Sequence, residues 1–118
     1  MFKVIIAGSR EFNDYNILKA YADFKLSKVQ EEIEVVSGTA RGADRLGEMY
    51  AKEKGYQIKR FPADWGKYGK KAGIIRNRAM AEYADALLAY WDGKSSGTRN
   101  MIEVARELDL KVGVKIVS

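Results

Sequence analysis

A glycine-rich stretch in the first half of the chain has the residue types that bind phosphate. Residues 37–44, Ser-Gly-Thr-Ala-Arg-Gly-Ala-Asp, lead from a short apolar run into a helical pattern. Such a turn points free backbone N–H groups at one place, and the dipole of the following helix favours an anion there. We interpret the stretch as a phosphate cradle, with simple packing of the helix as the alternative. Its candidate ligand-binding residues are Ser37, Gly38, Thr39, Arg41, Gly42 and Asp44.

A second stretch with the same character lies later in the chain. Residues 91–98, Trp-Asp-Gly-Lys-Ser-Ser-Gly-Thr, also lead into a helical pattern, and they predict a second anion cradle. A P-loop would need a glycine where Leu88 stands. We therefore do not expect ATP hydrolysis by that route. The candidate residues are Asp92, Gly93, Lys94, Ser95, Gly97 and Thr98.

Three further segments add ligand-binding candidates. Gly8-Ser9-Arg10 offers close backbone approach, a hydroxyl and a guanidinium suited to phosphate. In the segment Phe61-Pro62-Ala63-Asp64-Trp65, the Trp65 ring could stack on a base or anchor the core. On a later helical segment we expect Arg76 and Asn77 to face a cleft, whereas Arg78 points elsewhere. The candidates from these segments are Gly8, Ser9, Arg10, Asp64, Trp65, Arg76 and Asn77.

The chain contains no histidine and no cysteine. This composition excludes disulfides, zinc sites of Cys and His, and Ser-His-Asp or Cys-His catalysis. Acid–base chemistry must come from Asp, Glu, Lys or Tyr, and any metal would be oxygen-ligated, like Mg²⁺. Asp44 could bind such an ion through water or hold a ribose hydroxyl. We expect no required cofactor and no metal site of the protein alone, although Mg²⁺ could accompany a phosphate ligand.

The charge distribution also favours an anionic partner. The formal net charge is +5, and residues 66–78 carry Lys67, Lys70, Lys71, Arg76 and Arg78 without a single acid. A solvated helix face usually mixes both signs, so we assign part of this segment an anion-binding role.

The secondary-structure elements that position these residues are predicted from the spacing of apolar residues, which alternates along the chain between strand-like runs and helical periodicity. Apolar runs predict strands over 2–7, 33–37, 56–61, 85–91 and 111–117. Helices are expected after Asn13 or Asp14, from 43 to Gly55, from about 70 to Tyr83, and after a Thr98 cap. Residues 62–69 are expected to form a loop. The inward faces are Ile17, Leu18, Tyr21 and Phe24, then Ala43, Leu46, Gly47, Tyr50 and Ala51, then Ile75, Ala79, Met80 and Tyr83, and last Met101, Ile102, Ala105 and Leu108.

Strand–helix alternation with short connections predicts an α/β fold of about five mostly parallel strands with helices on both faces. Ligands of such sheets bind at the carboxyl ends of the strands. All the candidate loops follow strands, so they should converge on one edge. With 118 residues, the chain is expected to form one domain, residues 1–118. It has no signal peptide pattern and no apolar run long enough for a membrane span, so we expect a cytoplasmic protein with no membrane partner.

The five segments together resemble the YspA-like, cpYpsA-related family of the SLOG superfamily, which also contains Lonely Guy phosphoribohydrolases and the DNA-processing protein DprA. The resemblance covers nearly the whole chain, with the motifs in the expected order. It implies a Rossmann-like three-layer sandwich and a site for nucleotides or nucleotide-derived ligands. Oligomers are common in the superfamily, so we expect a homo-oligomer, a dimer or larger.

The resemblance to Lonely Guy enzymes departs at one position. Gly97 and Thr98 match the Gly-Thr of their Pro-Gly-Gly-x-Gly-Thr-x-x-Glu loop, but the glutamate falls on Met101. Glu103 is rotated by about 200° around the helix. The Arg-Lys pair of those enzymes becomes Arg76 and Asn77.

The leading hypothesis from the sequence is therefore the binding or sensing of a phosphate-bearing nucleotide or nucleotide derivative. Arg10, Arg41 and Arg76 would neutralise its charge, and Asp44 or Asp92 would take ribose hydroxyls or Mg²⁺. One alternative is an N-glycosidic phosphoribohydrolase acting on nucleoside monophosphates, with Asp92 or Asp44 in place of the missing glutamate. The other is DprA-like binding of single-stranded DNA, for which residues 37–44 and 76–78 are the match.

Overall fold

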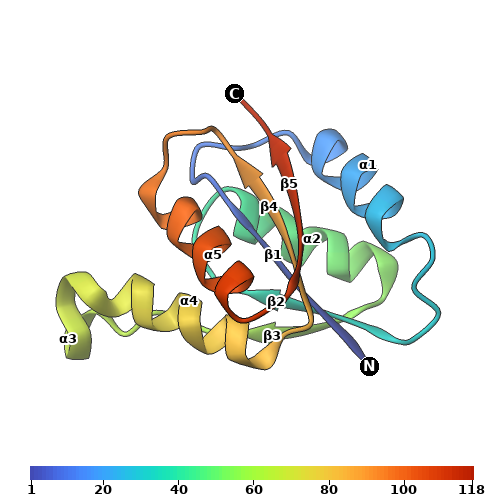
Figure 1. The fold of residues 1–118 in the computed structure, drawn as a ribbon. Coiled ribbons are helices and arrows are strands. Elements are labelled where there is room, and N and C mark those ends of the chain that lie inside the picture. Colours follow the sequence, from blue (N-terminus) through green and yellow to red (C-terminus); the bar gives the residue numbers. More distant parts are fainter.

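A computed structural model describes all residues, 1–118, and contains one sheet of five parallel strands in the order β3-β2-β1-β4-β5 (Figure 1). The strands are β1 (Phe2–Gly8), β2 (Ile33–Ser37), β3 (Gln57–Arg60), β4 (Ala86–Trp91) and β5 (Lys111–Ile116). The helices are α1 (Tyr15–Leu26), α2 (Ala43–Lys54), the short α3 (Trp65–Tyr68), the 3₁₀ helix η1 (Gly69–Lys71), α4 (Ala72–Tyr83) and α5 (Ser96–Glu107). The predicted Rossmann-like α/β fold is confirmed.

Helices cover both faces of the sheet, and the central residues of β1, Val4 to Ala7, are accordingly all apolar and buried. Val4 and Ile6 pack with α1 and α2 in one core, which also holds Leu18 and Tyr50. Ile5 and Ala7 belong to a second core on the other face, built with α4 and α5. Successive side chains of a strand point to opposite faces, so a continuous apolar run is what a doubly covered strand requires. None of the helices is long and apolar enough to cross a membrane.

The strand order reverses next to the central strand. The chain passes outward from β1 through β2 to β3 on one side, then returns to place β4 on the other side of β1. The register pairs Gly8 at the end of β1 with Tyr90 near the end of β4. The loops that leave β1 and β4 therefore diverge to opposite faces, which opens a crevice at their carboxyl ends.

The segment predicted as a loop over 62–69 is largely helical, and that prediction was wrong. The Asp64 side chain caps α3 by accepting a hydrogen bond from the Lys67 N–H at 3.0 Å. The 3₁₀ helix then leads directly into α4. A single cap with four helical residues leaves no apolar periodicity to read in the sequence. Helix α3 and the 3₁₀ helix, residues 65–71, form an arm that projects from the body (Figure 1).

The predicted inward faces are correct only in part. In α1 the buried residues are Leu18, Ala22 and Leu26, spaced by four, whereas Phe24 is 72% exposed. Ile17 is exposed as well. In α4 Met80 is buried and Ile75 is exposed, while a polar residue, Asn77, takes a buried position. The apolar residues of α1 and α4 outnumber those that the sheet can cover.

The remaining differences concern helix and strand ends. Helix α5 begins at Ser96 with Ser95 as its cap, so Thr98 is a buried residue of the first turn rather than the cap. In α5 Val104 is buried and Leu108 lies just past the helix end, while in α2 Leu46 is only partly buried. Strand β3 is shorter by one residue at each end than the expected 56–61. Gly55 is the left-handed cap of α2, as expected, and its N–H bonds the Lys52 carbonyl.

Candidate functional site

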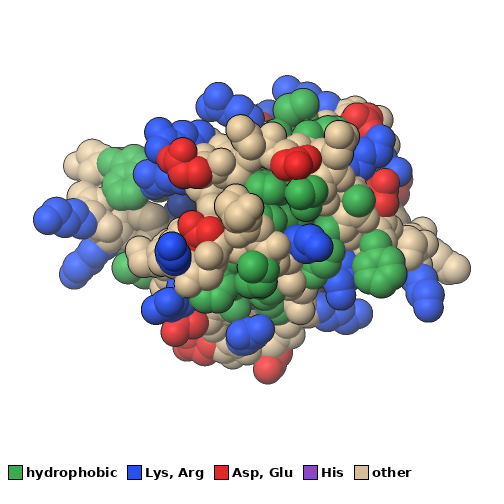
Figure 2. Space-filling model, turned by 90° about the horizontal axis from the view of Figure 1, so that it is seen from above, with side chains coloured by type: hydrophobic (Ala, Val, Ile, Leu, Met, Phe, Trp, Pro, Cys, Tyr) green, Lys and Arg blue, Asp and Glu red, His purple; other side chains and the backbone are tan.

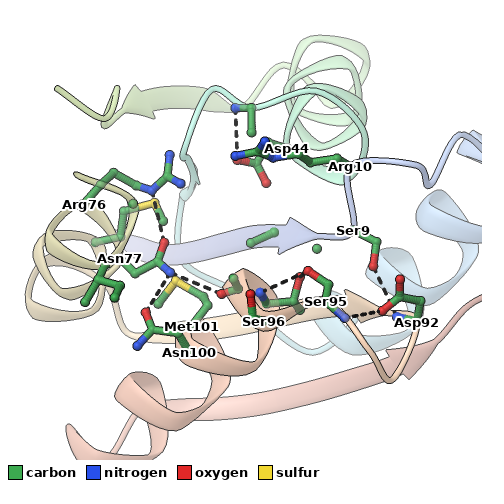
Figure 3. A pocket seen from close by; sticks show the side chains of 18 of the residues that line it. Ser9, Arg10, Asp44, Arg76, Asn77, Asp92, Ser95, Ser96, Asn100 and Met101 are labelled. Carbon is green, nitrogen blue, oxygen red and sulfur yellow. Dashed lines mark hydrogen bonds between the residues drawn. The ribbon is translucent and has the colours of Figure 1, made fainter. Parts of the chain in front are cut away.

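A cavity of about 570 Å³ lies at the carboxyl ends of β1 and β4. We call it the main cavity. Its walls come from the β1 and β4 loops, the start of α2, the arm, α4 and the first turns of α5 (Figure 3). The predicted residues that line it are Gly8, Ser9, Arg10, Asp44, Trp65, Arg76, Asn77, Asp92, Ser95, Gly97 and Thr98.

A smaller depression of about 300 Å³ adjoins the main cavity, and we call it the side hollow. Three predicted residues of the loop after β2, Gly38, Thr39 and Arg41, line the side hollow and not the main cavity. The two spaces share Arg10, Ala40, Trp65 and Arg76.

Five predicted residues line neither space, and each has a local role or is exposed. Ser37 is fully buried; its hydroxyl donates to Glu48 Oε2 at 2.6 Å and accepts the Thr39 N–H at 3.0 Å. Asp64 caps α3. Gly93 and Lys94 are exposed in the turn before α5. The fifth residue, Gly42, is the N-cap of α2.

Gly42 joins the loop after β1 to the start of α2. Its φ is +79°, and a Cβ at this position would come within 2.4 Å of the Ser9 carbonyl oxygen. The neighbouring Ala43 N–H donates to the same carbonyl at 3.3 Å. Only glycine fits this left-handed, tightly packed position. The backbone of Ser9 and Arg10 therefore packs against the start of α2, where the first cradle was expected to bind phosphate. Gly42 permits this packing and does not line either space.

The second cradle leaves donors free. Asp92 Oδ1 accepts the N–H groups of Lys94 and Ser95, both at 2.8 Å, and these bonds lower the pKa of Asp92. Ser95 Oγ accepts the Thr98 N–H at 3.5 Å. The N–H groups of Ser96 and Gly97, at the first two positions of α5, have no partner within the protein. Both residues line the main cavity. An anion is favoured at such a helix start.

Ser9 holds the two central loops together. Its N–H donates to the Tyr90 carbonyl at 2.9 Å, and its hydroxyl accepts the Asp92 N–H at 3.2 Å. The side chain is buried. Ser9 thereby ties the end of β1 to the end of β4, with its hydroxyl directed at Asp92 (Figure 3), and it also lines the main cavity.

Arg76 reaches from α4 across to the loop after β2. One guanidinium nitrogen donates to the Gly38 carbonyl, and Nε donates to Asn77 Oδ1 at 3.1 Å. Burial lowers the pKa of Arg76, and Asp44 opposes that effect. An arginine remains charged under these conditions. Arg76 therefore presents a fixed positive charge on the wall shared by both spaces.

Asn77 has all its near contacts inside the protein. Its side-chain nitrogen donates to Asn100 Oδ1 at 2.9 Å and to the Gly97 carbonyl at 3.3 Å, while its oxygen accepts from Arg76 (Figure 3). The side chain is buried. An amide with both donors and its acceptor engaged has little left to offer a ligand. Asn77 links Arg76 to the start of α5 as a positioning residue.

Asp44 is a buried carboxyl group beside Arg76. Burial raises its pKa to about 6, against the opposing effects of the Ala40 N–H and the Arg76 charge. Its Oδ2 accepts the Ala40 N–H at 3.2 Å. No group of three or more carboxylates comes together anywhere in the chain to hold a metal ion. Mg²⁺ at Asp44 would therefore need ligand oxygens and water.

Sequence reasoning missed several residues of the main cavity. Ser96 and Asn100 belong to the first turns of α5, and Lys70 and Ile74 come from the arm and the start of α4. Lys70 lies in the acid-free run, so its charge was a usable signal. Ile74 gave none, because the sequence does not distinguish an apolar residue of α4 that lines a cavity from one that packs in the core. Met101 also lines the main cavity, so a thioether occupies the wall where Lonely Guy enzymes carry their glutamate.

A sequence model described as "YspA, cpYpsA-related SLOG family" matches residues 2–68, more than half of the chain. The chain belongs to this SLOG family. "Gene 61 protein" of Mycobacterium phage D29 is 35% identical over an alignment of 125 positions that covers 100% of this chain and 96% of the phage protein. The family model thus covers the first three strands and the first cradle, whereas the phage relative matches the chain along its full length.

Among solved structures, DNA processing protein A (DprA) from Streptococcus pneumoniae has a similar fold. The TM-score is 0.74 at 20% sequence identity, and the match covers 100% of this SLOG chain. The chain spans about half of the DprA chain, 51%. At this identity the likeness establishes the fold alone.

Proposed function

We propose that this chain binds a phosphate-bearing nucleotide, or a ligand derived from one, in the main cavity. The observation that carries the proposal is that two kinds of phosphate-binding donor, the first amides of a helix and arginine side chains, come from residues of one cavity. Ser96 and Gly97, whose N–H groups have no partner within the protein, line it together with Arg10 and Arg76. Helix-start amides and arginines are the two protein groups best suited to phosphate oxygens.

The other walls suit the rest of a nucleotide. The Trp65 ring is 51% exposed at the cavity and is free to stack on a base, so it is not the core anchor that the sequence left open. Ile74 lies on the same wall. Mixed apolar walls with a few fixed polar groups are typical of small-molecule sites, which span about 300–1,000 Å³. Mg²⁺ could enter with the phosphates and share their oxygens with Asp44.

A thermal-shift screen of the purified protein tests this proposal. The panel is AMP, ADP, ADP-ribose, NAD, cyclic dinucleotides and a short single-stranded DNA. A ligand at 100 times its dissociation constant adds about 2.7 kcal/mol, which raises the melting temperature by roughly ten degrees in a domain of this size. A selective shift with a nucleotide supports the proposal. No shift with any nucleotide contradicts it.

Arg76→Glu is the variant that probes the site, and Arg78→Glu is its matched control. Arg78 lies two residues along the same helix, where it is exposed and pairs only with Glu107 at 3.2 Å. An exposed pair contributes about 0–1 kcal/mol, so the control should fold and bind normally. We expect Arg76→Glu to abolish nucleotide binding while its circular dichroism spectrum remains that of the folded protein. Retained affinity in a folded Arg76→Glu variant would contradict the assignment.

The two alternatives have separate signatures in the same screen. Release of free base from AMP would favour an N-glycosidic hydrolase, in which Asp92 or Asp44 would have to replace the missing glutamate. A shift with single-stranded DNA alone, with affinity falling steeply with salt, would favour a nucleic-acid site. The fold shared with DprA motivates that second assay. Basic side chains lie at the left of Figure 2, and the arm carries the exposed Lys67, Lys70 and Lys71, which phosphates of a nucleic acid could contact.

A further inference from the structure

The side hollow has a composition that the main cavity lacks. Three arginines line it, Arg10, Arg41 and Arg76, and no acidic residue does. The carboxylates of the site, Asp44 and Asp92 among them, line the main cavity instead. The charged residues that line the side hollow are therefore all basic, which favours an anionic group there.

The charge of Arg41 is available to a ligand. Its only ionic partner is Glu11, at 2.9 Å, and both side chains are mostly exposed. Such a pair contributes about 0–1 kcal/mol, so a phosphate oxygen can compete for the guanidinium at little cost. Arg76, in contrast, is held in place by the Gly38 carbonyl and by Asn77.

The wall of the side hollow is also rigidly held. Thr39 has a φ of +63°, which is unusual for a β-branched residue. Its N–H is bonded to Ser37 Oγ, and Ser37 in turn donates to Glu48, which pairs with Arg60 at 2.8 Å. This chain of contacts fixes the loop after β2. A strained backbone kept in place by its surroundings is a common feature of ligand sites.

The remaining walls of the side hollow are apolar. Pro62, Ala63 and Trp65 complete the lining. The space thus combines guanidinium donors with flat apolar surface, which suits a sugar or a ring that is attached to phosphate. Because Arg10, Arg76 and Trp65 line both spaces, a ligand that extends from one space into the other would contact these three residues.

We infer that the preferred ligand is a pyrophosphate-bridged dinucleotide or nucleotide sugar, with one end in the main cavity and the other in the side hollow. The inference rests on the proposed function. The bridging phosphates lie between Arg10 and Arg76, and Arg41 contacts the end in the side hollow. A nucleoside monophosphate fills the main cavity alone and leaves Arg41 unused.

The test compares AMP with ADP-ribose, which is AMP extended by a second phosphate and a ribose. Titration calorimetry of the wild-type protein should show ADP-ribose binding at least tenfold more tightly than AMP. A charge-assisted hydrogen bond accounts for a change of about tenfold. In Arg41→Gln we expect the affinity for ADP-ribose to fall by about that factor, while the affinity for AMP changes by less than threefold.

Arg45→Gln is the matched control. Arg45 is an exposed arginine in the first turn of α2 that lines neither space and forms no ion pair. It reports the effect of lost net charge alone, so it should leave both affinities within threefold of the wild type. Equal losses in Arg41→Gln and Arg45→Gln would overturn the inference.

The failure of this inference differs from the failure of the proposed function. If AMP binds and ADP-ribose binds no more tightly, the main cavity is a nucleotide site but the side hollow is not part of it. If neither compound binds, the proposed function fails first. If Arg41→Gln weakens only the binding of a single-stranded oligonucleotide, the side hollow belongs to a nucleic-acid path and the inference is wrong.

Discussion

Asp44 in the main cavity has a raised pKa, which makes its contribution to the free energy of unfolding depend on pH. It is buried, and the groups that face it are the Arg76 guanidinium, the Glu48 carboxylate and the Ala40 N–H. Burial dominates and raises the pKa from its ordinary value of 3.8 to about 6. The folded protein therefore holds this proton more tightly than the unfolded chain does. Between pH 4 and pH 6 the contribution of Asp44 to the stability of the protein therefore falls as the pH rises.

This argument predicts that Asp44→Asn stabilises the protein above pH 6. The neutral amide avoids the burial of a charge, and the pKa shift corresponds to at most roughly 3 kcal/mol in the free energy of unfolding. The gain should shrink to nothing near pH 4, where the wild-type carboxyl group is protonated in the folded state. Urea unfolding at pH 4, 6 and 8 measures it. Glu103→Gln, on the exposed face of α5, is the control. A stabilisation that does not change with pH would contradict the argument.

At the scale of the element, the turn before α5 prepares the main cavity. Asp92 holds the backbone of Lys94 and Ser95 through one carboxylate oxygen, and Ser95 caps the helix. The free N–H groups of Ser96 and Gly97 follow immediately. The direction of these N–H groups depends on the preceding turn, because the first amides of a helix have no intrahelical hydrogen-bond partner to hold them.

We therefore expect Asp92→Ala and Asp92→Asn to differ in their affinity for the nucleotide. Asparagine keeps an oxygen that can accept both N–H groups, and it removes a negative charge from the cavity, so this variant should bind at least as well as the wild type. Alanine also removes the charge but releases the turn. Its affinity should be about tenfold below that of Asp92→Asn. Equal affinities in calorimetry would show that the side chain does not organise the turn.

At the scale of the whole molecule, large apolar side chains are exposed on several elements, among them two places on opposite faces of the sheet. One group lies on and next to the arm and contains Trp65, Tyr68, Ile74 and Ile75. The other includes Phe24 on α1, on the opposite face of the sheet. Basic side chains gather at the arm as well, at the left of Figure 2. We propose that the chain forms a homo-oligomer, a dimer or larger, through the group at the arm.

Sedimentation velocity tests this prediction. The wild-type chain should sediment as a dimer or a larger assembly, and Ile75→Glu should shift it to the monomer, because a buried carboxylate at an apolar contact is costly. Ile75 lines neither the main cavity nor the side hollow. Phe24→Glu makes the same kind of change on the other face and should leave the assembly intact. A monomeric wild type would contradict the prediction, and loss of the assembly in Phe24→Glu alone would move the contact to α1.

The local pattern of the sequence determined the fold and the edge where the site lies. Apolar runs such as 2–7 and 33–37 are strands because both faces of a parallel sheet are buried, and the alternation with helices leaves little choice of topology. Every loop after a strand then reaches the same edge. Fourteen of the nineteen predicted residues accordingly line the main cavity or the side hollow, eleven the first and three the second alone.

Only the tertiary structure decided what each of those residues does there. In the sequence Asn77 looks like a ligand contact beside Arg76, yet its partners are Gly97 and Asn100. These residues are 20 and 23 positions further along the chain, and they become neighbours of Asn77 only when α4 packs on α5. Ser37 turns to Glu48 and supports a loop instead of facing the cavity. The sequence specifies which donors exist, because donors are a property of residue type. Which of them remain free depends on contacts between distant segments, which form only when the helices pack against the sheet.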